Sequence, residues 1–420
     1  MVSKEILKNI ILEDIHIPSL INRDIKIYDI NKIYSVIGPR RAGKTHFLLQ
    51  VVASLNLSKS NFLYINFEDD RLIDLQTSDL DLIINSFYEL YPSSVTEKVY
   101  FLFDEIQNVP NWSKFVRRLY DKKNCEIYVT GSSAKLLSKE IATELRGRTW
   151  VYSIFPFSFI EYLNFKNIPF EKNSVYSNDR FKIVEEFNNY FVEGGFPEVV
   201  GKEKFVRCSI LQSYFDLVLF RDVIERYPQY SSHVVKDFML FLIDNVSRPI
   251  SVNKYYNSLK SKGISISKDT LYALQEHISD TFYFHFVSIY SKSQRVRSVN
   301  PKKVYCVDNG LVNCISSSLD NVGWLYENSV FLHLFRNGYE INYFKGDNEC
   351  DFIAIKGKEI IPIQVSLSPK DEREINGLRE AMSFFKSKEG YIISSDISEE
   401  IKLEEGTIFI IPLWNWLVSF

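Results

Sequence analysis

A short loop at residues 38–45 combines glycine, lysine and threonine at the spacing GxxxxGK[ST]. Glycines let backbone N–H groups turn toward a phosphate, and the helix that follows adds its positive N-terminal end. In this pattern Lys44 bridges the β- and γ-phosphates, and the Thr45 hydroxyl is a Mg²⁺ ligand. We therefore predict a nucleotide-binding loop that consists of Gly38, Pro39, Arg40, Arg41, Ala42, Gly43, Lys44, Thr45 and His46.

Two acidic residues, Asp104 and Glu105, follow the apolar run VYFLF at residues 99–103. A carboxylate at the end of a buried strand can hold Mg²⁺, usually through water, and we assign this role to Asp104. Its neighbour Glu105 can polarise an attacking water, so we expect it to act as the general base. A surface acidic pair is the alternative. Downstream of a phosphate-binding loop, however, the two stretches predict a single site for a nucleoside triphosphate and Mg²⁺.

Further polar side chains are candidates for contact with the γ-phosphate. Ser132 follows the strand-like run CEIYVTG and could sense that phosphate, or together with Thr130 it could cap the next helix. Arg146 and Arg148 flank a glycine, and an arginine there could neutralise charge on the γ-phosphate, within one chain or across a subunit interface. Solvated surface arginines are the alternative. The sequence has no NKxD guanine-recognition motif, so ATP is the expected nucleotide.

The elements around these residues must form an α/β sheet. The run KIYSVI at residues 32–37 reads as a buried strand and THFLLQVVASL at 45–55 as the helix after it. The wholly apolar run VYFLF is typical of a parallel strand that is buried on both faces. Open α/β sheets bind ligands at the carboxyl ends of their strands, so this arrangement brings the loop and the acidic pair together.

Six stretches along the chain, in a fixed order, carry a family resemblance. They are GPRRAGKT, LYINFEDDRL, FLFDEIQNVPNW, VTGSSAKLL, LRGRTWVYSIFPFSFIEYL and YFVEGGFPE. Together they resemble the archaeal and bacterial P-loop ATPases of the AAA+-like archaeal-ATPase group, which is related to the signal-transduction ATPases. The resemblance covers nearly the whole chain and implies a C-terminal domain of restriction-endonuclease type. It also implies that Arg148, rather than Arg146, acts at the nucleotide.

Four domains are expected, all within an α/β class of fold. The expected boundaries are a P-loop ATPase core at 1–165, a helical lid at 166–245, a winged helix-turn-helix at 246–303 and a nuclease-like domain at 304–420. In the third domain a short helix, a turn with a glycine, a helix capped by Ser267 and a pair of aromatic strands follow in order. That order places the second helix where it can enter a DNA major groove. A module for packing against another protein is the alternative.

A basic run at residues 292–303 makes DNA a candidate partner. It contains five basic residues and no acidic one: Lys292, Arg295, Arg297, Lys302 and Lys303. Such a local excess suits phosphate contacts even though the net charge of the chain is −3. DNA is therefore expected to bind through the winged helix and this run, if the chain binds DNA at all.

The expected nuclease-like domain has lost part of its catalytic pattern. An active site of this type needs carboxylates that hold Mg²⁺ and a lysine that positions the attacking water. The resemblance matches Glu327 and Asp351 to the first two acids, but Gln364 and Ser366 stand where an acid and a lysine belong. A glutamine is a neutral metal ligand, and a serine supplies no positive charge. Lys370 lies beyond the segment LSP and is not expected to take the role. We predict a degenerate site that does not cut nucleic acids.

Composition narrows the remaining choices. The chain is 45 % hydrophobic and 25 % charged, as in ordinary globular proteins, and no apolar run is long enough to span a membrane. The five cysteines are scattered and no pair has CxxC spacing, so we expect reduced thiols in a cytoplasmic protein.

Two functions fit these observations. One is a Mg²⁺-dependent ATPase whose cycle drives or gates DNA-associated binding domains. The other is a nucleotide-dependent signalling or assembly switch without DNA as a substrate. The sequence leaves open whether the chain forms homo-oligomers, and an active nuclease is the least favoured function.

Overall fold

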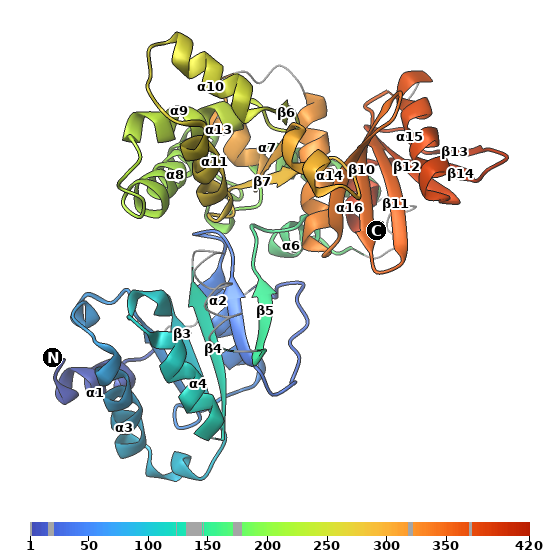
Figure 1. The fold of residues 1–420 in the computed structure, drawn as a ribbon. Coiled ribbons are helices and arrows are strands. Elements are labelled where there is room, and N and C mark those ends of the chain that lie inside the picture. The colour runs from blue at the N-terminus through green and yellow to red at the C-terminus, as the bar shows by residue number, and fades with distance from the viewer. Residues whose placement is uncertain are drawn as a thin grey trace. The chain divides into compact units, whose positions relative to one another are not determined.

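The computed structural model describes residues 2–15, 21–122, 124–131, 145, 147–170, 179–317, 322–368 and 372–420 (Figure 1). The chain forms two compact units, Met1–Phe155 and Pro156–Phe420. The first boundary therefore falls before the one expected after residue 165. The physical reason is that helix α6 (Phe159–Phe165) packs with the second unit, where Phe159 meets Phe187 edge to face at 5.7 Å between ring centroids.

The first unit is built on a parallel sheet with the strand order β2-β3-β4-β1-β5. Its strands are β1 (Ile33–Ile37), β2 (Phe62–Asn66), β3 (Val99–Asp104), β4 (Cys125–Gly131) and β5 (Thr149–Ser153). Successive side chains of a strand point to opposite faces. In β3, for example, Phe101 and Phe103 join one hydrophobic cluster and Leu102 joins the other. The predicted α/β class is thus confirmed for this unit.

Helices cover both faces of this sheet. Helix α2 (Lys44–Ser54) contributes Phe47 and Leu48 to one cluster. The opposite cluster contains residues of α1 (Lys4–Leu12), α3 (Leu80–Leu90) and α4 (Trp112–Lys122). The described residues of this unit also form the short 3-10 turns η1 (Asp70–Leu72), η2 (Thr77–Asp79), η3 (Pro92–Val95) and η4 (Ile106–Asn108).

The second unit begins with a group of helices, as the sequence predicted for residues 180–243. These are α6, α7 (Asp179–Glu193), α8 (Lys204–Leu217) and α9 (Ser232–Asp244), with the turn η6 (Pro197–Val199) and the π-helix η7 (Val218–Ile224). A disulfide between Cys208 and Cys314 joins α8 to α13 (Asn309–Ile315). The expectation of reduced thiols is therefore wrong for this pair, because packing of the two helices brings cysteines 106 residues apart together. In the part of the chain that the structure describes, Cys125, Cys306 and Cys350 form no disulfide and are buried.

A small three-stranded antiparallel sheet follows, with the order β6-β8-β7. Along the chain its parts are β6 (Pro249–Ile250), α10 (Val252–Ser261), α11 (Lys268–Ser279), β7 (Phe284–Val287), α12 (Gln294–Val299) and β8 (Lys302–Cys306). Helix α11 begins after Ser267, whose hydroxyl accepts a hydrogen bond from the backbone N–H of Thr270. The elements occur in the predicted order. The expected boundary after residue 303, however, cuts through β8.

The C-terminal part is a mixed six-stranded sheet with the order β13-β14-β12-β11-β10-β9. Its strands are β9 (Glu340–Lys345), β10 (Glu349–Lys356), β11 (Glu359–Val365), β12 (Glu389–Ser394), β13 (Glu399–Lys402) and β14 (Thr407–Pro412). Helix α15 (Glu372–Phe385) buries Leu378 and Met382 against the sheet. Helices α14 (Val322–Arg336) and α16 (Leu413–Ser419) contact each other and further strands. Strands β10 and β11 form an antiparallel hairpin.

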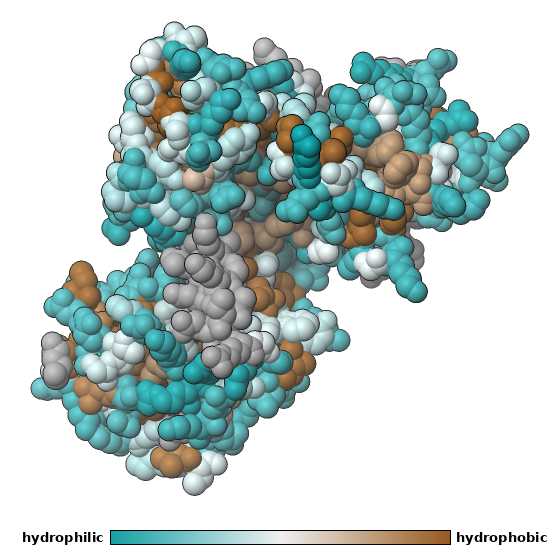
Figure 2. Space-filling model, viewed as in Figure 1, coloured by the Kyte–Doolittle hydropathy of each residue, from teal (hydrophilic) through white to brown (hydrophobic). Residues whose placement is uncertain are grey.

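The face seen in Figure 2 is mainly hydrophilic, with hydrophobic residues in small groups. Within the described ranges, no helix combines the length and the apolar character that crossing a membrane requires.

Candidate nucleotide site

The predicted nucleotide-binding loop lies between β1 and α2, at the carboxyl end of the strand. Gly38 has φ +147°, and a Cβ there would lie 1.9 Å from the backbone oxygen of Ile154. Gly43 begins α2 with φ +99°. The close backbone approach together with the positive φ explains Gly38, and the positive φ alone explains Gly43.

Lys44 points into the loop. Its side chain is 5 % exposed, and Nζ donates hydrogen bonds to the carbonyl oxygens of Gly38 at 3.2 Å and Pro39 at 3.1 Å. The same Nζ lies 3.7 Å from Oε1 of Glu105. The ammonium group is thus held where a bound phosphate chain would meet it.

The two residues predicted as magnesium ligands are in direct contact. Thr45 Oγ1 donates to Asp104 Oδ2 at 2.7 Å, and Tyr64 OH donates to the same oxygen at 3.0 Å. Thr130 Oγ1 donates to the other carboxylate oxygen, Oδ1. Burial raises the pKa of Asp104, while the hydrogen bonds from Thr130 and Thr45 act in the opposite direction. One hydroxyl and one carboxylate fit Mg²⁺, which keeps several waters and takes its other oxygens from phosphates.

Glu105 is fixed next to this pair by its backbone. It has φ +51°, and its N–H donates to Thr130 Oγ1 at 2.9 Å. Its carboxylate accepts a hydrogen bond from Gln107 Nε2 at 2.5 Å. The Thr130 hydroxyl therefore connects the carboxylate of Asp104 to the backbone of Glu105. Ser132, the candidate that follows strand β4, lies outside the described residues.

Two residues of this site were missed by the sequence analysis. Tyr64, on β2, holds Asp104 as described above. Arg23 is 9 % exposed and holds the nucleotide-binding loop by a hydrogen bond from Nη1 to the carbonyl oxygen of Ala42 at 2.9 Å. Its Nη2 donates to the carbonyl oxygen of Phe155. Arg23 lies outside the six stretches of the family resemblance, and Tyr64 lies within LYINFEDDRL, where nothing local marks it as a partner of Asp104. Only the parallel pairing of β2 with β3, which opposes Asn66 to Asp104, brings Tyr64 into range.

Arg148 does not lie at the nucleotide site of its own chain. Its carbonyl oxygen accepts a hydrogen bond from Ile33 N at 2.8 Å, so it stands beside the first residue of β1, whereas Gly38 follows the last. At about 3.3 Å per residue, the strand separates the two positions by roughly 16 Å. The guanidinium pairs instead with Asp121, with 2.9 Å between Nε and Oδ1. In this structure Arg148 therefore does not reach the nucleotide-binding loop of its own chain, and its action at a nucleotide stays a prediction. Arg146 lies outside the described residues.

Three of the four residues predicted for a degenerate nuclease site, Glu327, Asp351 and Gln364, come together in the second unit, and Ser366 follows two residues after Gln364. Gln364 Nε2 donates to Asp351 Oδ2 at 2.7 Å, and all four side chains belong to buried residues: Glu327, Asp351, Gln364 and Ser366. Lys303 also contacts this group, with Nζ 2.8 Å from Asp351 Oδ1 and 3.1 Å from Glu327 Oε1. Burial raises the pKa of Glu327 to about 8, although Lys303 attracts its carboxylate.

This placement corrects two expectations. Lys303 is 3 % exposed and cannot contact DNA, because it lies on the β8 face that turns toward α14 and β10. Although Ser366 supplies no charge, a positive charge is present at the site and comes from a different strand. Lys370 lies outside the described residues.

The exposed part of the basic run lies between β7 and β8. Residues 292–299, which include α12, are all exposed, and Lys292, Arg295 and Arg297 are among them. We call residues 292–299 the wing. Lys302 is half-buried at the start of β8.

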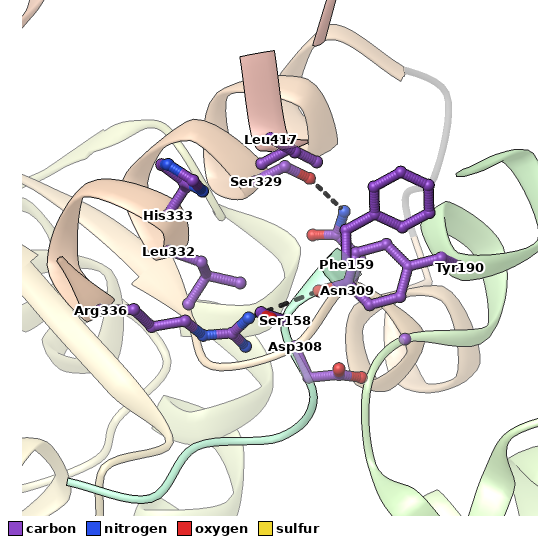
Figure 3. Close-up of a pocket in the computed structure, with 11 residues that line it drawn as sticks. Ser158, Phe159, Tyr190, Asp308, Asn309, Ser329, Leu332, His333, Arg336 and Leu417 are labelled. Carbon is purple, nitrogen blue, oxygen red and sulfur yellow. Dashed lines mark hydrogen bonds between the residues drawn. The ribbon is translucent and has the colours of Figure 1, made fainter. Parts of the chain in front are cut away.

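A cavity of about 20 Å³ lies elsewhere in the second unit, lined from α6, α7, α13, α14 and α16 (Figure 3). This is room for about one water molecule, so the cavity is too small for a nucleotide. Beside it, Asp308 Oδ2 accepts from the backbone N–H of Gly195 at 2.6 Å. A Cβ on Gly194 would lie 2.1 Å from Asp308 Oδ1. The GGFPE motif is thus explained by close packing.

Comparisons with known proteins agree with the P-loop geometry. Residues 30–163 match a family described as an AAA domain, and residues 184–321 match a domain of unknown function. The uncharacterized protein MJ1544 of Methanocaldococcus jannaschii is 35 % identical over 440 residues, which cover 100 % of this chain and 97 % of the relative. An uncharacterized protein of Haemophilus influenzae is 32 % identical over 402 residues, 94 % of this chain and 96 % of the relative.

Solved structures give only remote likenesses. The Aeropyrum pernix ORC1 protein in complex with DNA is 12 % identical, with a TM-score of 0.26 over 68 % of this chain and 86 % of that one. Cdc6p from Pyrobaculum aerophilum is also 12 % identical, with a TM-score of 0.26 over 71 % and 89 %. We draw nothing about function from likenesses at this level.

Proposed function

Because the chain belongs to the family of its M. jannaschii and H. influenzae relatives and carries an AAA domain with a P-loop, we propose that it is a Mg²⁺-dependent ATPase whose nucleotide cycle gates DNA-binding parts of the second unit. The observation that carries the proposal is the convergence of Lys44, Thr45, Asp104 and Glu105 at the carboxyl ends of β1 and β3.

Each residue of the site has a separate task in this proposal. The backbone of residues 38–45 surrounds the phosphates and Lys44 binds the β- and γ-phosphates. Thr45 would hold Mg²⁺ directly and Asp104 would hold it through water, where the ion would supply positive charge next to the transferred phosphoryl group. Glu105 takes a proton from the attacking water, and Thr130 positions Glu105 and Asp104 relative to each other.

We assign the remaining parts of the chain as the sequence predicted: a helical lid, a winged helix and a nuclease-like domain that does not cut nucleic acids. The winged-helix assignment is supported by the order β6–α10–α11–β7–β8 and by an exposed wing that contains three basic residues and no acidic one. Helix α11 exposes Asp269 and Glu276 as well as Lys268. DNA phosphates are therefore expected to meet the wing more than the helix.

An assembly switch is the second candidate, and the position of Arg148 favours it. This arginine lies at the amino end of β5, far from its own P-loop and partly exposed. A γ-phosphate could therefore reach Arg148 only if it belonged to ATP bound by a neighbouring copy of the chain. In this candidate, bound ATP sets the assembly state and hydrolysis resets it.

ATP hydrolysis with and without DNA tests the proposal. The parent and Lys44→Ala are compared in Mg²⁺ alone and with single-stranded, duplex or branched DNA, at low and at moderate salt. We expect hydrolysis by the parent that Lys44→Ala abolishes and that DNA stimulates. Hydrolysis without any DNA binding at low salt would favour the assembly switch, and no hydrolysis under any condition would contradict both candidates.

A further inference from the structure

The most unusual charged group of the second unit is a buried lysine among three acidic residues. Nζ of Lys303 lies 2.8 Å from Asp351 Oδ1, 3.0 Å from Glu349 Oε1 and 3.1 Å from Glu327 Oε1. These partners come from β10 and α14, while Lys303 belongs to β8. Together the four residues form what we call the lysine cluster.

The ammonium group is held by hydrogen bonds and by an ion pair. Nζ donates hydrogen bonds to Glu327 Oε1 and Asp351 Oδ1 and forms an ion pair with Glu349 Oε1. Such a group can stay charged inside a protein only when it is paired in this way.

The carboxylates have other partners as well. Asp351 Oδ2 accepts from Gln364 Nε2 at 2.7 Å and from Val365 N at 3.0 Å. Glu327 Oε1 also accepts from Tyr305 OH at 2.7 Å. A glutamate at position 364 could not donate in this way and would place another negative charge beside Asp351. The glutamine is therefore matched to a site that already contains its cation.

A divalent cation would need the same oxygens. Mg²⁺ and Ca²⁺ bind carboxylate oxygens at about 2.0–2.6 Å, so an ion among these three side chains would occupy the space of the ammonium group. Two cations cannot share this space. Within the described residues, no group of three or more carboxylate, imidazole or thiol side chains stands arranged for a metal ion.

We propose that the Lys303 ammonium replaces a divalent cation in the lysine cluster, so that the cluster is held together without metal and becomes a divalent-cation site only when the ammonium is removed. The vacated site would offer the oxygens of Glu327, Glu349 and Asp351, which are hard ligands suited to Mg²⁺, Mn²⁺ or Ca²⁺. This inference is independent of the proposed ATPase function.

The cluster also connects parts of the chain that are far apart in sequence. Strand β8 directly follows the wing and pairs with β6 and β7. Through Lys303 it is tied to α14 and to β10 of the C-terminal sheet. The lysine therefore fixes the strand from which the wing extends.

Replacement of Lys303 in the full chain tests the proposal, with Mn²⁺ as the probe. Lys303→Met keeps the length of the side chain and removes the charge. In EDTA we expect its thermal unfolding midpoint to lie well below that of the parent, because the acids repel one another. Mn²⁺ should raise this midpoint, and electron paramagnetic resonance should count one more bound Mn²⁺ per chain than in the parent. The rise in midpoint with Mn²⁺ and the extra bound Mn²⁺ should both disappear in Lys303→Met/Asp351→Asn.

Two controls separate this site from the nucleotide site. All proteins carry Asp104→Asn, so that the P-loop contributes no Mn²⁺ binding through that carboxylate. In this background the otherwise unchanged chain and its Asp351→Asn variant should bind the same number of Mn²⁺ ions. A lower count in Asp351→Asn would overturn the proposal, because it would show that the cluster already takes a metal. Lys303→Met that folds without extra Mn²⁺ binding, or that fails to fold in both EDTA and Mn²⁺, would also overturn it.

Discussion

The ammonium nitrogen of Lys44 lies 3.7 Å from Oε1 of Glu105, and the two side chains are 5 % and 12 % exposed. Lys44 is expected to bind oxygens of the γ-phosphate, and a general base must lie within reach of the water that attacks that phosphate. Their proximity in the structure therefore favours Glu105, rather than Asp104, as the base, because Asp104 is engaged by Thr45, Tyr64 and Thr130.

Glu105→Gln should bind ATP and fail to hydrolyse it. The amide keeps the size of the side chain but cannot accept the proton of the water, and a general base typically contributes about 10²–10⁴-fold. We expect kcat to fall by at least about 100-fold while the Kd for a fluorescent ATP analogue stays within threefold. Gln107→Ala, which removes the hydrogen-bond donor to Glu105, is the matched control and should have a smaller effect. Turnover of Glu105→Gln at the parent rate would show that another group is the base.

Thr130→Val should impair hydrolysis more than Tyr64→Phe. Both variants lose one hydrogen bond to Asp104, but only Thr130 also holds the backbone of Glu105. A hydrogen bond to a charged group contributes about 1.5–3 kcal/mol, which corresponds to about 10- to 100-fold in rate. We expect this loss in kcat for Thr130→Val. For Tyr64→Phe we expect mainly a higher Mg²⁺ concentration at half-maximal activity. Equal effects on kcat would contradict a positioning role of Thr130.

Arg148 is expected to act only between copies of the chain. Arg148→Ala should lower kcat by on the order of 10³-fold, as for an arginine finger, with little change in ATP affinity. Mixing it with Lys44→Ala should restore activity, because the second variant supplies an intact Arg148 to an intact P-loop. Asp121→Asn, which removes only the ion-pair partner, serves as the control. If Arg148→Ala by itself turned over ATP at the normal rate, Arg148 would have only a structural role at the amino end of the sheet.

Alanine substitutions in the wing should reduce the salt dependence of DNA binding. Replacing Lys292, Arg295 and Arg297 should flatten the slope of log K against log salt by about one unit for each lost phosphate contact. Lys303 is left unchanged, because it is buried. The control is a variant with alanines at three exposed lysines of the C-terminal part: Lys386, Lys388 and Lys402. An equal slope in both variants would exclude the wing as the DNA contact.

Acid should destabilise the second unit through His285. Its ring packs on Phe331 and Phe335, and burial lowers its pKa to about 4, below the ordinary value of 6.5. The unfolded chain therefore takes up a proton at this residue before the folded chain does, so stability falls as the pH drops from about 6.5 to about 4. The thermal midpoint should fall over this range, and less so in His285→Gln. An exposed histidine variant, His46→Gln, should follow the parent, and an unchanged profile in His285→Gln would contradict the prediction.

The parts of the nucleotide site that could be predicted are those written in short stretches of sequence. The P-loop is eight consecutive residues, and Asp104 and Glu105 directly end an apolar strand, so local patterns place them at the carboxyl edge of a parallel sheet. Tyr64 and Arg23 could not be found in this way, because they reach the site from other segments through sheet pairing and loop packing.

The sequence was least informative wherever the chemistry depends on distant segments. Arg148 follows a motif-like glycine, but its place at the amino end of the sheet depends on the pairing of β5 with β1. The pattern at 364 and 366 indicated a missing lysine, whereas Lys303 reaches Asp351 from 48 residues earlier in the chain. Strand pairing decided the neighbours of Arg148, and the packing of two different sheets decided those of Lys303; local spacing encodes neither.

The bond between Cys208 and Cys314 closes a covalent ring that contains α9, α10, α11 and the whole wing. Trypsin cleaves after exposed basic residues, and the exposed ones within this ring include Arg295 and Arg297 in the wing. A single cut there would leave the two fragments covalently attached, with the mass of the full chain on a gel without reductant. Only a thiol reagent would separate them, so the nicked protein can lose the continuity of its wing before the second unit comes apart.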